Sequence, residues 1–206
     1  MQSEWILLIY SLPSQPSRKR AYVWRELKRL GAVYLRDGVV VLPRRADLEE
    51  RMRSMVARVV EYEGTADLVL SPQFVTGTPK NLVDRFQEER SSEYAELHRA
   101  GLRFLRDVLY EVDQEDFDFP DVDNLESELM RLYRWRDQIA ERDYFQAPGA
   151  DRVDETLNKC RRAFENFVAT ASDRAGSKSE SQSEDVFERL GGENVSSQVV
   201  PDDFPL

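Results

Sequence analysis

The sequence predicts an α+β fold: a ferredoxin-like βαββαβ sandwich, followed by an antiparallel helical bundle and a disordered C-terminal tail. The first observation behind this is the order of patterns in residues 1–78, which is strand, helix, strand, strand, helix, strand, a split βαβ unit. The second is that only helical periodicity follows, and the third is a polar stretch at the end. We therefore expect a ferredoxin-like domain at 1–78, a helical region at 79–172 and a disordered tail at 173–206.

The first strand and helix are marked by an apolar run and an amphipathic stretch. Trp5–Tyr10 is continuously apolar, which is typical of a strand buried on both faces. Ser17 is a suitable N-cap for the helix that follows, and Gly31 is a suitable residue to end it. The apolar stripe predicts that Trp24 and Leu27 lie in the core. Its members are Ala21, Val23, Trp24, Leu27 and Leu30.

A hairpin and a second helix complete the predicted sandwich. Two apolar stretches, 32–36 and 39–42, flank Asp37-Gly38, a dipeptide that favours a type I′ turn because both central residues need positive φ. Asp47–Tyr62 has helical periodicity, and Asp67–Leu70 reads as the fourth strand.

The rest of the chain is predicted to be helical up to a polar tail. Stripes of apolar residues predict helices over Asn81–Val112, Leu125–Ile139 and Val153–Phe167, packed as a bundle. The acidic stretch EVDQEDFDFPDVD is interpreted as a solvated connection. From Asp173 the composition turns to Ser, Gly, Glu and Asp, which is too polar to fold alone.

Composition excludes several classes of site. With one Cys and one His, a zinc site of the usual ligand set is unavailable, and neither GxGxxG nor GxxxxGK occurs. His98 is interpreted as a surface or half-buried residue, so we assign no catalytic residue, metal or cofactor and favour a protein that is not an enzyme. No apolar stretch is long enough to span a membrane, and no signal peptide is evident, so we expect a cytoplasmic protein without membrane contact.

The charge is unevenly distributed. The net charge is −10, yet residues 1–60 contain twelve Lys/Arg and only six Asp/Glu. A basic front on an acidic chain favours a polyanionic partner such as DNA.

Six basic residues form the candidate site for nucleic acid or an oxyanion. Most lie near the starts of the two predicted sandwich helices, where unpaired backbone N–H groups favour an anion. Cations there oppose the helix dipole, so their placement is locally unfavourable. Taking the first and third strands as parallel neighbours, we expect both helix starts at one end of the sandwich, as a single patch. Solubilising surface charge is the alternative. The six are Arg18, Lys19, Arg20, Arg25, Arg44 and Arg45.

Three segments of the chain resemble a known family. WILLIYSLPSQPSRKRAYVWRELKRLGAVYLRDGVVVLP, LESELMRLYRWRDQIAERDYF and GADRVDETLNKCRRAFENF are similar to the N-terminal domain of the chromate resistance protein ChrB family. The resemblance implies a chromate-responsive regulator of resistance operons, or a protein of unassigned role. It also implies a second, C-terminal domain, in whose place we expect the tail. Chromate is tetrahedral like sulfate, so arginines at a helix start are chemically suited to it.

The sandwich is also similar to two other groups of proteins. One is the C-terminal domain of the phenylacetate-degradation repressor PaaX, whose members read DNA with a separate winged helix. The other is the small subunit of CRISPR spacer acquisition, which holds a metal on an Asp at the end of the first strand. Here that position is Tyr10 or Ser11, so the resemblance does not imply a metal-dependent nuclease.

Three hypotheses of function follow. In the first, a ChrB-type regulatory protein associates with DNA through its basic helix starts, by charge rather than by reading bases. In the second, the same arginines bind chromate or another oxyanion without any role for DNA. In the third, the acidic bundle and tail form an interaction scaffold for a basic partner. The fold also suggests a homodimer formed through an edge or face of the sheet.

Overall fold

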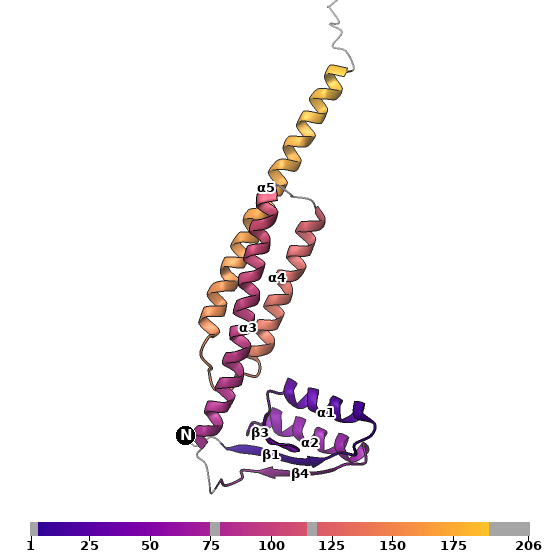
Figure 1. Ribbon diagram of the computed structural model, residues 1–206, viewed down its shortest axis with the longest axis vertical. Coiled ribbons are helices and arrows are strands. Elements are labelled where there is room, and N and C mark those ends of the chain that lie inside the picture. The colour runs from indigo at the N-terminus through magenta and orange to yellow at the C-terminus, as the bar shows by residue number, and fades with distance from the viewer. Residues whose placement is uncertain (1–3, 75–78, 115–118, 190–206) are drawn as a thin grey trace, which may run out of the picture.

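The computed structural model describes residues 4–74, 79–114 and 119–189, with the backbone alone for 79–80, 119 and 175–189 (Figure 1). It confirms the α+β fold class. In chain order the elements are β1 (Trp5–Ser11), α1 (Ser17–Arg29), β2 (Val33–Arg36), β3 (Val39–Pro43), α2 (Ala46–Glu61), β4 (Thr65–Leu70), α3 (Pro79–Gln114), α4 (Phe119–Ala140) and α5 (Ala150–Arg189).

The first six elements form the βαββαβ sandwich. The sheet has the strand order β2-β3-β1-β4, with every neighbouring pair antiparallel, and α1 and α2 lie on the same side of it (Figure 1). In the centre of the sheet, Ile6 pairs with Leu42 and Leu8 with Val40, and all four side chains are fully buried. The predicted burial of the whole first strand is wrong at Ile9, which is 40% exposed.

The turn between β2 and β3 depends on a glycine. Gly38 has φ +71° and its carbonyl accepts a hydrogen bond from the Tyr10 backbone N–H at 2.7 Å. A Cβ at this position would clash with the Tyr10 carbonyl oxygen, so no other residue fits without a shift of the backbone. The expected type I′ turn is wrong, because Asp37 does not share the positive φ. The strand pairing instead contains an irregularity between Tyr34 and Arg36.

The predicted start of helix α1 is one residue off, whereas its predicted end is confirmed. Ser17 is its first helical residue rather than its N-cap, and Pro16 caps it without a side-chain hydrogen bond. At the other end Gly31 has φ +71°, and the N–H groups of Gly31 and Ala32 donate to the carbonyls of Lys28 and Leu27. This is the Schellman arrangement, so the predicted role of Gly31 is confirmed.

The core assigned to α1 is partly wrong. Val23 and Leu27 are fully buried and Leu30 is 8% exposed, but Trp24 is 52% exposed. Val23, Leu27 and Leu30 are spaced i, i+4, i+7 and so lie on one face, whereas Trp24 is rotated about 100° away from Val23.

Helices α3, α4 and α5 form the bundle, running up, down and up beside one another (Figure 1). Polar contacts join them as well as apolar packing: the Cys160 thiol donates to the Gly101 carbonyl at 3.3 Å, and the Tyr133 hydroxyl donates to the Leu157 carbonyl at 3.3 Å. The fully or nearly fully buried bundle residues are Tyr94, Leu97, Phe104, Val108, Leu132, Ile139, Val153, Leu157, Cys160 and Phe167.

Two polar segments differ from the sequence prediction. The acidic stretch expected to be a connection is largely helical, because α3 continues to Gln114 and α4 begins at Phe119. The tail expected from Asp173 is helical as far as Arg189, where α5 ends. Residues 190–206 of that predicted tail lie outside the described residues.

The sandwich and the bundle share an aromatic contact. Phe86 of α3 stacks against Trp5 of β1, with ring centroids 5.8 Å apart, and Phe145 packs against both rings. The Tyr144 hydroxyl donates to the Leu30 carbonyl at the end of α1, at 2.8 Å. Within the described ranges, no helix combines the length and apolar character that crossing a membrane requires.

The two α1 residues assigned to the core should differ sharply in their contribution to stability. We expect Leu27→Ala to lower the free energy of unfolding by about 2–5 kcal/mol, because it empties a fully buried site. We expect Trp24→Ala to change it by less than about 0.5 kcal/mol, because the indole is half exposed. Urea denaturation followed by circular dichroism measures both, and equal destabilisation of the two variants would contradict this placement.

Candidate functional site

The two basic clusters lie at opposite ends of the sandwich. Because β1 and β3 pair antiparallel, the helices that follow them run in opposite directions. Lys19, at the start of α1, is 3.6 Å from the Glu63 carboxylate and lies over the Tyr62 ring, just beyond the end of α2. The expectation of one patch formed by both helix starts is therefore wrong, since it assumed that β1 and β3 are parallel.

At the start of α2, the arginines already have partners within the sandwich. The Arg44 guanidinium donates to Glu4 at 2.9 Å and to the Ser71 hydroxyl at 2.8 Å, and it lies 3.4 Å from Glu49. Arg45 donates to Asp47 at 3.1 Å, and its guanidinium lies over the Tyr144 ring. Both side chains are engaged by other residues of the sandwich, and Arg45 also contacts Tyr144 beside the bundle. An external anion would have to compete with the carboxylates of Glu4, Glu49 and Asp47.

On α1 the basic residues are more accessible. Arg18, Arg20 and Arg25 are exposed, and none forms an ion pair with another residue that the structure describes. Helix α1 contains six Lys/Arg and one acidic residue, Glu26. Of the six candidate residues, these three arginines are the ones free to meet an external anion.

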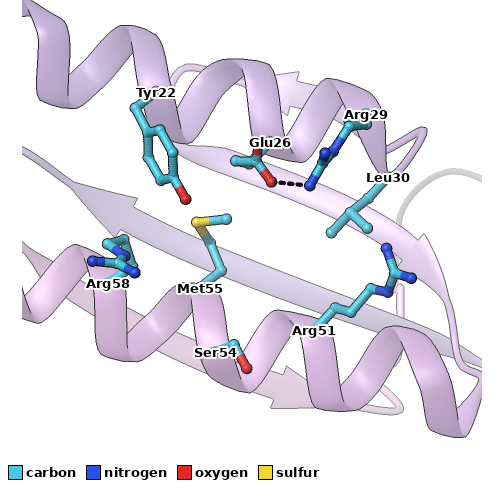
Figure 2. A pocket seen from close by; sticks show the side chains of 8 residues that line it. All are labelled: Tyr22, Glu26, Arg29, Leu30, Arg51, Ser54, Met55 and Arg58. Atoms are coloured by element: carbon cyan, nitrogen blue, oxygen red, sulfur yellow. Dashed lines mark hydrogen bonds and ion pairs between the residues drawn. The ribbon is translucent and has the colours of Figure 1, made fainter.

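A groove lies between α1 and α2 on the outer side of the helix layer (Figure 2). Its volume is about 240 Å³, and Figure 2 shows side chains of the two helices pointing toward each other across it. Three arginines, one glutamate, one serine and a tyrosine provide its polar groups. The lining residues are Tyr22, Glu26 and Arg29 from α1 and Leu30 just after it, with Arg51, Ser54, Met55 and Arg58 from α2.

The groove has an excess of positive charge. Arg29 is neutralised by Glu26 at 2.6 Å, and Arg58 is paired with Glu61 at 2.8 Å. Arg51 forms no ion pair with the described residues, and Figure 2 shows it reaching across toward Leu30. The arrangement offers one unpaired guanidinium and two paired ones to an anion of modest size.

Sequence reasoning missed Arg29, Arg51 and Arg58 as a set. The signal that would have found them is the direction of the helices. In a split βαβ sandwich with all strands antiparallel, the end of α1 lies beside the start of α2, which brings Arg29 close to Arg51. The i, i+7 spacing of Arg51 and Arg58 then places both on one face of α2.

The described residues form neither a metal site nor a reactive cysteine site. Among the residues that the structure describes, no group of three or more His, Cys, Asp or Glu side chains could hold a metal ion. His98 is half-buried in the bundle, where its Nδ1 lies 2.8 Å from the Thr156 hydroxyl. Burial raises the pKa of the Cys160 thiol to about 11, so this cysteine is an unreactive core residue.

Comparison with known proteins assigns the chain to a family. A family model described as "Protein ChrB, N-terminal" matches residues 20–177. The chain belongs to the ChrB N-terminal family. It is also 34% identical over 95 residues to Protein ChrB of Cupriavidus metallidurans, an alignment covering 46% of this chain. The aligned part spans only 29% of that relative's length.

The ChrB N-terminal match includes most of both structural units. It begins within α1, after β1, and ends within α5, so one family region contains parts of the sandwich and of the bundle. Residues 142–145 end the second segment that resembles the family, and they lie where the two units meet, with Tyr144 and Phe145 in contact with the sandwich.

Glu49 should make stability at the start of α2 depend on pH. Its hydrogen bond to Arg53, together with that to Arg44, lowers the pKa of the Glu49 carboxyl below its usual value. The stabilisation is therefore present above the unfolded carboxyl pKa of about 4.3 and is lost as the pH falls through the lower folded pKa. We expect Glu49→Gln to be less stable than wild type at pH 7, and this difference to shrink below about pH 4.3.

Urea denaturation at several pH values measures this difference. Glu50→Gln is the matched control, because Glu50 is an exposed neighbour whose carboxylate has no ion pair among the described residues. A constant difference between Glu49→Gln and wild type across the acid range would show that Glu49 does not interact as described.

Proposed function

We propose that this ChrB-family protein takes part in chromate resistance as a regulatory protein, and that it associates with nucleic acid through the exposed arginines of α1. Family membership supports the first part. The distribution of charge on the helix layer supports the second. Contacts of this kind would be made to phosphates, which position a protein on DNA without reading its sequence.

The observation behind the proposal is the set of exposed arginines on α1 in an otherwise acidic chain. Arg18, Arg20 and Arg25 have no ion pair among the described residues, although the protein has a net charge of −10. A protein of this overall charge is repelled by DNA at long range, so association requires a local basic surface. Helix α1 provides one, with Arg18 and Arg25 on one face about 10 Å apart along its axis.

The salt dependence of duplex binding tests this proposal. We expect wild-type protein to bind a fluorescently labelled duplex at low salt and to release it as salt rises. We expect the triple variant R18Q/R20Q/R25Q to bind more weakly and to flatten the slope of log affinity against log salt by about 0.9 for each phosphate that it no longer neutralises. Fluorescence anisotropy at several salt concentrations measures both quantities.

A triple variant on the bundle separates local contact from net charge. R103Q/R106Q/R162Q removes the same number of exposed positive charges from α3 and α5. The proposal is overturned if wild type fails to bind at low salt, or if the two triple variants have the same slope.

The groove between α1 and α2 supports a second candidate function, the binding of a tetrahedral oxyanion such as chromate or sulfate. The specific observation is that three arginines from two helices meet around a space of about 240 Å³. Guanidinium groups bind oxyanions through paired N–H donors, and Arg51 lacks a carboxylate partner among the described residues.

Arg51 should separate the two candidate functions. We expect Arg51→Gln to weaken binding of sulfate and chromate about tenfold, the effect of removing one charge-assisted hydrogen bond. We expect R18Q/R20Q/R25Q to leave oxyanion binding unchanged. Isothermal titration calorimetry measures both, and no heat of binding from either anion to wild type would remove this candidate.

The homodimer stays a prediction. Ile9 of β1 and Val69 of β4 leave apolar surface on the sheet, with 40% and 36% of these side chains exposed. Sedimentation velocity of the wild type measures the oligomeric state directly.

A further inference from the structure

A second cavity lies in the bundle, where α3 passes the start of α5. Its volume is about 470 Å³, within the range of small-molecule sites, and it is separate from the groove on the sandwich. The lining residues that matter here are Ser91, Tyr94, His98, Arg99 and Leu102 from α3, and Arg152 from α5.

The polar lining of this cavity is positive. Arg99 and Arg152 form no ion pair with the residues that the structure describes, and no carboxylate is among the lining residues. Burial lowers the pKa of His98, and the charged groups that lower it further are all cations, namely Arg152, Lys159 and Arg99. An uncompensated positive cavity in an acidic chain favours an anion.

Hydrogen bonds fix the histidine ring. The Thr156 hydroxyl donates its one proton to the Arg152 carbonyl at 2.8 Å, so it must accept the hydrogen bond from His98 Nδ1, also at 2.8 Å. The neutral ring therefore has its proton on Nδ1. Its Nε2 forms no hydrogen bond with the described residues.

The remaining walls are apolar. Leu102 is 49% exposed, and Tyr94 has its hydroxyl engaged by Asp143 at 3.2 Å, which leaves the ring as its contribution to the cavity. Ala95 and Pro148 complete this side. A bare tetrahedral oxyanion would leave these walls uncovered, whereas an anion with an apolar body would cover them.

We propose that this cavity binds a small organic carboxylate with a compact apolar body. Arg99 and Arg152 would receive the carboxylate, and Leu102 and Tyr94 would contact the apolar part. The site does not depend on the proposed association with nucleic acid, because none of its lining residues belongs to the sandwich.

The one histidine of the chain provides a direct reporter. In proton NMR, we expect benzoate to cause a saturable shift of the His98 ring resonances of the full chain. Benzamide has the same body without the charge, and sulfate has charge without the body. We expect each of these two to bind at least about tenfold more weakly than benzoate, because each lacks one of the two interactions.

Variants of the two arginines complete the test. We expect Arg99→Gln and Arg152→Gln each to weaken benzoate binding about tenfold, and Arg103→Gln, an exposed residue one turn further along α3, to leave it unchanged. The proposal is overturned by the absence of a saturable benzoate shift, by equal binding of sulfate or benzamide, or by equal effects of Arg103→Gln and Arg99→Gln. The ligand comparison uses wild type alone, so it remains decisive if a variant does not fold.

Discussion

The stacking of Trp5 on Phe86, with Phe145 against both rings, joins the first strand of the sheet to the first helix of the bundle. Trp5 and Phe86 are each 2% exposed, so neither unit could bury these rings without the other. Tyr144 adds a hydrogen bond from its hydroxyl to the Leu30 carbonyl, which α1 leaves unpaired at its end. Because burying one aromatic ring contributes about 1.5–3 kcal/mol, the contact is strong enough to fix how the bundle lies against the sandwich.

A polar layer borders this aromatic contact. Arg90 is 2% exposed and lies 3.2 Å from Glu93, while its Nε and Nη1 have no hydrogen-bond partner among the described residues. Burial lowers the pKa of Arg90, and each unsatisfied donor costs about 1–3 kcal/mol. This polar layer also requires a glycine at position 31, because a Cβ there would lie 3.1 Å from Arg90 Nη1 and 2.8 Å from the Arg142 Cβ. Burial of the aromatic rings must therefore offset the cost of the unsatisfied Arg90 donors.

The sequence was sufficient to predict the order of the strands and helices, since each has a characteristic apolar periodicity. Gly31 also marks the end of α1, and Gly38 marks the turn between β2 and β3. The sequence was less informative about the directions in which the two sandwich helices run. Whether α1 and α2 start at the same end depends on the pairing of β1 with β3, which is a tertiary property. The sequence analysis took this pairing as parallel and so joined into one patch two clusters that the antiparallel pairing places at opposite ends. Trp24 shows a different limit, because apolar character alone placed it in a stripe that the i, i+4 spacing of Val23 and Leu27 excludes. The burial of Arg90 could not be predicted, since it results from contact between distant segments.

The segment between α4 and α5 links the sandwich, which has the groove between α1 and α2, to the positive cavity in the bundle. Tyr144 and Phe145 contact the sandwich, and Pro148, three residues later, lines the cavity in the bundle. Asp143 strengthens this short connection, because its carboxylate accepts hydrogen bonds from the Ala147 backbone N–H at 3.0 Å and from the Tyr94 hydroxyl. A displacement of Pro148 would therefore be resisted by contacts that extend to the end of α1. A ligand in the cavity would influence the sandwich only if it bound two arrangements of this segment with different affinity, and the closely packed rings around Trp5 make a second arrangement costly.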